Sequence, residues 1–77
     1  MPVVYIKNFT CKGTSAKYNI VNKSSTYVRY ITIIIYDSDN DPIDSVLKSV
    51  YVKPGTGDKQ SHYLDCASMT SIGFKAE

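Results

Sequence analysis

The 77-residue chain has few of the residues from which catalytic and metal sites are usually recognised. It contains no tryptophan, one histidine (His62) and two cysteines (Cys11 and Cys66). A structural zinc site takes four cysteine or histidine ligands, so these three residues cannot complete one. No apolar run approaches the roughly 20 residues with which a helix spans a bilayer. The sequence therefore predicts no metal, no cofactor and no membrane span.

An excess of one charge is also missing. Nine lysine and arginine residues stand against seven acids, which gives a net charge of +2. Nucleic-acid-binding domains usually show a stronger basic excess, so no nucleic-acid partner is predicted. No basic region and apolar segment of a secretory signal follow Met1. Either the domain stays in the cytosol, or Met1 stands where a signal has been removed.

Helical periodicity is absent as well, because no stretch of about 11 residues repeats apolar positions at i, i+3, i+4 and i+7. Runs of β-branched residues and tyrosine alternate instead with clusters of Ser, Asn, Asp, Gly and Pro. The predicted strands cover residues 3–10, 15–22, 27–37, 43–53 (one or two strands), 60–64 and 71–75, with residues 56–59 as a loop. Short strands spaced by about 8–12 residues predict one all-β domain over residues 1–77. It is an antiparallel β-sandwich or, alternatively, a small closed β-barrel.

The two cysteines allow two interpretations. A bond between Cys11 and Cys66 would close a loop of about 56 residues, which the chain-entropy model credits with roughly 4 kcal/mol. Two buried free thiols are the alternative, since cysteine is among the most buried residue types. We expect the disulfide, and with it an oxidising compartment, so that the protein is periplasmic or secreted. A cytoplasmic, phage-encoded protein is the alternative.

The densest polar cluster comprises residues 37–41 and Asp44. Alternating acids resemble a calcium site, which takes six to eight oxygen ligands. The EF-hand pattern fails, however, because Pro42 stands where glycine is needed and Lys48 where the bidentate glutamate belongs. An acidic hairpin turn without a metal is therefore predicted.

Nucleophilic catalysis needs a base beside a serine, threonine or cysteine, itself held by a third group. His62 is the only histidine, and its neighbours Ser61 and Tyr63 should point to the opposite side of a strand. No catalytic residue is predicted.

The long strand at residues 27–37 carries the most informative pattern. Its odd positions are isoleucines predicted to face the core: Ile31, Ile33 and Ile35. Its even positions, from Val28 on, place Tyr30, Ile34 and Tyr36 on the opposite face, which a small domain cannot cover. Exposed apolar patches are often interaction sites, and tyrosine suits them. Two alternatives are cross-strand pairing that only stabilises the sheet, and a bulge that turns Tyr30 into the core.

Residues 33–37 (Ile-Ile-Ile-Tyr-Asp) resemble the F-x-L-Y-D signature of FxLYD domains, with isoleucine in place of Phe and Leu. Residues 18–24 are similar to the family's strand and Asn-x-Ser turn, and residues 50–56 to its step into Pro-Gly. Pro42 departs from the pattern, since a turn glycine is common there. The resemblance covers roughly residues 15–76. It implies an immunoglobulin-like β-sandwich of extracytoplasmic microbial proteins, without catalytic residues.

These features predict a non-enzymatic binding module outside the cytoplasm. It would recognise a protein partner or a second copy of itself through Tyr30, Ile34 and Tyr36. A small stand-alone inhibitor is the alternative, either of a periplasmic enzyme or, if phage-encoded, of a host protein.

Overall fold

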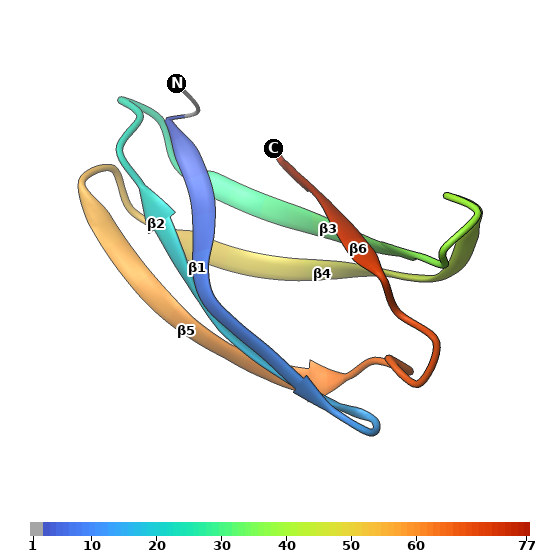
Figure 1. The fold of residues 1–77 in the computed structure, drawn as a ribbon. Helices are drawn as coiled ribbons and strands as arrows, with labels where there is room; N and C mark the ends of the chain where they lie inside the picture. Colours follow the sequence, from blue (N-terminus) through green and yellow to red (C-terminus); the bar gives the residue numbers. More distant parts are fainter. Residues whose placement is uncertain (1–2) are drawn as a thin grey trace.

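The computed structural model describes residues 3–77, which form six β-strands and no helix. The strands are β1 (Val4–Lys12), β2 (Ser15–Asn22), β3 (Val28–Tyr36), β4 (Pro42–Val52), β5 (Thr56–Tyr63) and β6 (Ser71–Ala76). They build two three-stranded antiparallel sheets, β1-β2-β5 and β4-β3-β6, which lie as two layers in Figure 1. The predicted β-sandwich is confirmed, and the sheets do not join into the alternative closed barrel. No helix in this part of the chain is long and apolar enough to cross a membrane.

The strand order is close to that of an immunoglobulin sandwich. There the first, second and fifth strands share one sheet, and the third and sixth share the other. Strands β1, β2 and β5 and strands β3 and β6 follow that rule. Strand β4 forms a hairpin with β3 instead of joining the β5 sheet, where constant-type domains place their fourth strand.

The turn between β4 and β5 is tighter than the sequence predicted. Gly55 has a φ of +76°, and the amide of Thr56 donates to the carbonyl of Lys53 at 3.2 Å. Pro54 followed by a glycine with positive φ fits a type II turn. Strand β5 therefore begins at Thr56 directly after the turn, so the prediction of a loop over residues 56–59 was wrong.

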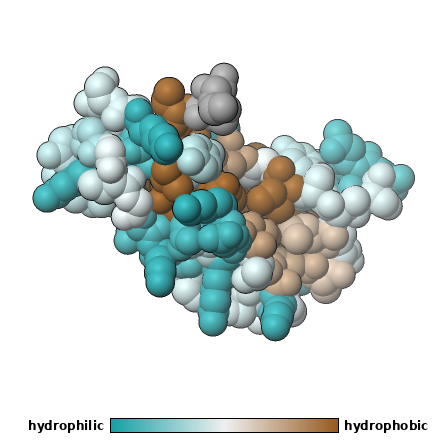
Figure 2. Space-filling model, turned by 60° about the vertical axis from the view of Figure 1, so that its left-hand side comes forward, coloured by the Kyte–Doolittle hydropathy of each residue, from teal (hydrophilic) through white to brown (hydrophobic). Residues whose placement is uncertain are grey.

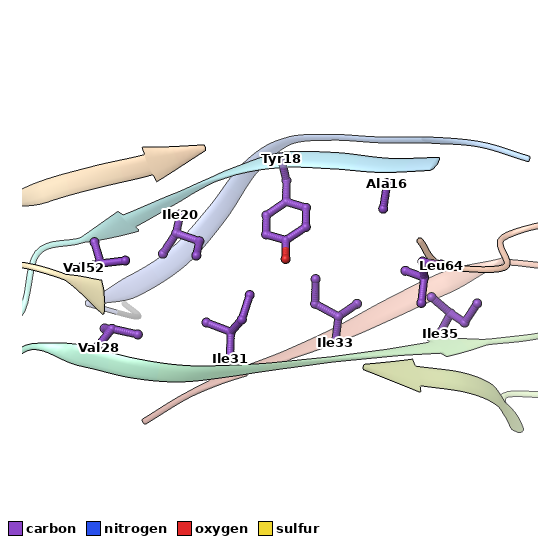
Figure 3. Close-up of a cluster of buried hydrophobic side chains, with 9 residues drawn as sticks. All are labelled: Ala16, Tyr18, Ile20, Val28, Ile31, Ile33, Ile35, Val52 and Leu64. Carbon is purple, nitrogen blue, oxygen red and sulfur yellow. The ribbon is translucent and has the colours of Figure 1, made fainter. Parts of the chain in front are cut away.

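The core is formed where alternate side chains of the two central strands meet between the sheets (Figure 3). Its buried members are Ala16, Tyr18, Ile20, Val28, Ile31, Ile33, Ile35, Val52 and Leu64. The predicted inward direction of the odd-numbered isoleucines is confirmed. Val28 was wrongly placed on the outer face, because the register shifts between Val28 and Tyr30 and turns Val28 inward. The shift does not bury Tyr30, so the alternative with Tyr30 in the core was also wrong.

One polar side chain, Asn22, is completely buried at the end of β2. Its Nδ2 donates to the carbonyls of Thr26 (2.9 Å) and Val52 (3.0 Å). Its Oδ1 accepts hydrogen bonds from the amide and the hydroxyl of Ser24, at 3.0 and 2.6 Å. A buried amide is tolerated when its hydrogen bonds are made. Here three of them order the β2–β3 connection, and the one to Val52 joins this connection to the end of β4.

Cys11 in β1 and Cys66 in the β5–β6 connection form a disulfide, as predicted, with their Cα atoms 6.3 Å apart. The amides of Leu64 and Cys66 donate to the carbonyls of Thr14 and Gly13, both at 3.1 Å. The disulfide and these two hydrogen bonds therefore fasten the connection between the sheets to the β1–β2 hairpin.

Candidate interaction surface

The outer face of the β4-β3-β6 sheet carries the predicted partner-binding residues. Because Ile31, Ile33 and Ile35 fill the core, the even positions from Tyr30 to Tyr36 point away from it. We name the exposed and half-exposed large side chains of this surface the aromatic face: Tyr30, Ile34, Tyr36, Leu47 and Tyr51. Exposed fractions are 49% for Tyr30, 71% for Leu47 and 58% for Tyr51. The structure therefore brings the three predicted residues together on one face, with two further residues from β4.

The three predicted residues differ in exposure, because Ile34 and Tyr36 are only half-exposed. Ile34 lies opposite Gly73 of β6, and the ring of Tyr36 leans over this glycine. A Cβ atom placed on Gly73 would lie 3.3 Å from Cε2 of Tyr36. A glycine inside a strand leaves an uncovered stretch of backbone, which a neighbouring aromatic ring can cover. Part of the Tyr36 ring is thus used in a contact within the sheet and is not free for a partner.

Sequence reasoning missed Leu47 and Tyr51, the most exposed members of the aromatic face. The signal in the sequence is an alternation of Val46, Val50 and Val52 on one side, which Lys48 interrupts. In the structure these residues are the half-buried or buried positions of β4. Tyr51 and Leu47 occupy the exposed positions, and Leu47 lies directly opposite Thr32 of β3. No direction could be assigned because the segment was not resolved into one strand or two.

An aromatic cluster extends the aromatic face at one end. The rings of Tyr27 and Tyr51 have centroids 5.1 Å apart, and Cζ of Arg29 lies 5.6 Å from the centroid of Tyr51. Such a cation–π contact holds the guanidinium against the ring. Two charged residues lie opposite these outward residues: Lys75 is across from Thr32, and Glu77 exchanges both backbone hydrogen bonds with Tyr30. The five members of the aromatic face are themselves uncharged, and Arg29, Lys75 and Glu77 border them.

His62 faces inward and is held by two hydrogen bonds. Its Nδ1 lies 3.0 Å from the carbonyl oxygen of Tyr63, and its Nε2 lies 2.8 Å from the hydroxyl of Tyr18. A carbonyl only accepts, so Nδ1 carries the proton; Nε2 of the neutral ring then accepts from Tyr18. Phe9 stacks on the other side of Tyr18, with ring centroids 5.8 Å apart. Both nitrogens of the only histidine are thus engaged in structural contacts.

Burial raises the pKa of Tyr18 from 10.0 to about 12. Below pH 10 the tyrosine is neutral in both the folded and the unfolded state. Between pH 10 and 12 the unfolded chain loses this proton while the folded chain keeps it, so stability should fall with rising pH. Tyr18→Phe should show a shallower fall of the unfolding free energy across this interval in urea titrations. Equal slopes for both proteins would contradict the assignment.

The acidic segment forms a tight turn between β3 and β4. Carboxylate oxygens of Asp37, Asp39 and Asp41 lie within 4.8 Å of one another. One carboxylate oxygen of Asp37 already accepts the amides of Asp39 (2.9 Å) and Asp41 (3.0 Å). Asn40 takes a φ of +64°, which asparagine tolerates in turns. The predicted acidic hairpin turn is present, and its hydrogen bonds are internal.

We expect calcium to have no effect on this turn. Millimolar calcium should leave the melting temperature unchanged, because an ion that binds only the folded state must raise it. Thermal unfolding followed by circular dichroism, with and without calcium, measures this. Magnesium at equal concentration is the control. A rise of several degrees with calcium alone would overturn the prediction.

Hydrophobic side chains reach the surface in patches bordered by hydrophilic ones in the view of Figure 2. Such patches are ordinary in a small domain. The aromatic face is therefore distinguished by its tyrosines and by their fixed positions on paired strands, and not by hydrophobicity alone. Comparison of the chain with protein-family models, curated proteins and solved structures found no match. The function proposed next therefore depends on the residues and geometry described above.

Proposed function

We propose that this chain is a non-enzymatic interaction module that binds a protein partner or a second copy of itself through the aromatic face. The observation that carries the proposal is a rigid sheet surface with Tyr30, Leu47 and Tyr51 largely exposed and little charge among them. The proposal concerns this surface alone and assigns no role in binding to the buried Tyr18–His62 pair.

The physical properties of the aromatic face suit protein recognition. Interface cores are depleted in charge and enriched in tyrosine, which supplies large contact area with few rotatable bonds. The face is built on hydrogen-bonded strands, so little order has to be created when a partner binds. Exposed serines between the large residues, Ser45 and Ser49 of β4, offer hydroxyls for hydrogen bonds.

The resemblance to FxLYD domains supports the proposed extracytoplasmic module, and the four specified positions of the signature have structural tasks in this chain. Ile33 and Ile35 fill the core, and Tyr36 covers Gly73. Asp37 accepts the amides that close the β3–β4 turn. Large apolar, apolar, tyrosine and aspartate residues are thus useful at these positions for structural reasons. Membership of the family remains our hypothesis.

The disulfide supports a location outside the cytoplasm. Disulfides persist in oxidising compartments and are rare where glutathione and thioredoxin keep thiols reduced. The Cys11–Cys66 bond therefore favours a periplasmic or secreted protein. A partner of the aromatic face would then be found in the same compartment.

Site-specific photocrosslinking tests the proposal. A photoreactive amino acid at position 47 should give a defined adduct in the producing cell, and the mass of the adduct separates a second copy from another protein. The same probe at position 14 is the control, because Thr14 is exposed in the turn between β1 and β2, outside the aromatic face. Adding Ile34→Lys should remove the adduct at position 47, since a charge in a desolvated apolar contact has no partner. Equal adducts at both positions, or none at position 47, would refute the proposal.

A further inference from the structure

The second sheet presents an outer face of opposite character. Its outward positions carry four lysines, which we name the lysine face: Lys7, Lys12, Lys17 and Lys59. No Asp or Glu occupies an outward position of β1, β2 or β5 within the described part of the chain. Asp58, the acid nearest in sequence, lies opposite the buried Ile20 and accepts a hydrogen bond from Gln60 at 2.7 Å. Four of the nine basic residues therefore share one outer face, with no acid at its outward positions within the described part of the chain.

Strand register arranges the lysine face in rows across the sheet. The rows are Lys7–Asn19–Lys59, Thr10–Lys17–Ser61 and Lys12–Ser15–Tyr63. Neighbouring strands lie about 4.8 Å apart, and successive outward residues of one strand about 7 Å apart. Lys7 and Lys59 thus stand about 10 Å apart, with each further lysine one row along. The four lysines are thus spread over three successive rows and are not gathered at one point.

Two hollows lie on this face. The larger, of about 650 Å³, is lined by Lys7, Asn19, Lys23, Gly57 and Lys59 among others. The smaller, of about 260 Å³, shares Asn19 and Lys59 with the first and adds Lys17, Asn8 and Ser61. Gly57 lies opposite Val21 and brings no side chain into the space. The hollows follow each other along β2, from one row to the next, so they form one shallow groove.

Clustered cations attract an anion. One acid, Asp58, also lines the larger hollow, at an inward position of β5 where its carboxylate accepts a hydrogen bond from Gln60. The middle of the groove offers two amides and a hydroxyl beside the lysines, from Asn8, Asn19 and Ser61. A protein interface would require an apolar core, which this middle row lacks. Single-stranded nucleic acid would require neighbouring aromatic platforms, yet Tyr5 and Tyr63 lie at opposite ends of the face.

We propose that the lysine face binds an extended anionic polysaccharide. Its carboxylates or sulfates would pair with Lys7, Lys17 and Lys59, and its hydroxyls with Asn19 and Ser61. The polysaccharide would lie along the strand direction and cross successive rows, on the side opposite the aromatic face. The two surfaces are independent, so the failure of one assignment leaves the other unaffected.

Nuclear magnetic resonance titration of the intact 77-residue protein tests the proposal. Heparin oligosaccharides supply sulfates and carboxylates, oligogalacturonate supplies carboxylates alone, and a neutral maltooligosaccharide is the control. Amide shifts should concentrate in β1, β2 and β5 with at least one anionic probe and should be absent with the neutral one. The stronger of the two anionic probes identifies the group that is recognised. Binding should weaken with added salt.

Two matched double variants separate a site from a general charge effect. Lys17→Gln with Lys59→Gln should weaken binding at least about tenfold, since two charge-assisted contacts are lost. Lys53→Gln with Lys75→Gln removes the same charge from exposed positions outside the lysine face and should change binding less than about twofold. Equal losses for both double variants would overturn the proposal.

Two probes test other occupants of the same face. Tighter binding of oligothymidylate or of oligoglutamate than of both anionic saccharides would show that the partner is a nucleic acid or an acidic protein segment. Salt-sensitive self-association of the protein alone, lost in Lys17→Gln with Lys59→Gln, would show that the acidic hairpin of a second copy binds there. Either result would refute the polysaccharide.

Discussion

Replacing both Cys11 and Cys66 with alanine should lower the free energy of unfolding by roughly 4 kcal/mol. The bond joins residues 55 positions apart, so its removal greatly enlarges the conformational freedom of the unfolded chain. A domain of this size holds only a few kcal/mol of net stability, so the variant should be partly or largely unfolded. Urea titrations of wild type and variant, extrapolated to water, measure the difference.

Reduction provides the control for this prediction. Wild-type protein kept in reductant should lose about as much stability as the double alanine variant, because both lack the same covalent link. Thiol titration of denatured, unreduced protein should find no free thiol. Two free thiols in material from an oxidising compartment would refute the bond and remove the main support for the proposed location. A loss of less than about 1 kcal/mol would show that the bond contributes little.

Ile33→Lys should unfold the protein. Ile33 is fully buried in the middle of the core, between the sheets, as Figure 3 shows. A lysine there has no partner for its charge and no path to water. Such a substitution lowers the free energy of unfolding by more than about 4 kcal/mol. Circular dichroism should therefore show the loss of the β-sheet signal at room temperature.

Ile34→Lys is the matched control, since it makes the same change one position along β3. Ile34 points outward and is half-exposed, so a lysine there can extend its amine into water. The cost should stay near or below about 1 kcal/mol, and the fold should persist. If Ile34→Lys unfolds the protein and Ile33→Lys does not, the two faces of β3 have been exchanged.

The sequence predicted those elements whose pattern is local. Strand β2 was predicted with its observed bounds, Ser15–Asn22, because inward and outward residues alternate and turns flank it. The inward isoleucines of β3 followed from the same alternation. Period-two patterning decides such cases because one face of each sheet must be buried.

Features that depend on partners were not predictable. Residues 57–59 (Gly-Asp-Lys) at the start of β5 have little strand propensity, and pairing with β2 makes them a strand. Val28 points inward because the register shifts between Val28 and Tyr30, and the sequence of β3 contains no residue from which this shift could be predicted. The half-burial of Tyr36 depends on Gly73, which lies far along the chain and directly beneath its ring. The direction of the predicted site residues could thus be inferred, whereas their exposure could not.

The buried Asn22 has a consequence for glycosylation. Asn22-Lys23-Ser24 is an N-x-S acceptor triplet, as Asn8-Phe9-Thr10 is an N-x-T triplet. A sugar on Asn22 would be attached to the nitrogen that donates to Thr26 and Val52 inside the fold. Asn8, in contrast, is exposed. In a host that attaches N-linked sugars, a glycan at Asn22 would mark molecules that were modified before folding and cannot close the sandwich. A folded molecule can carry its glycan at Asn8.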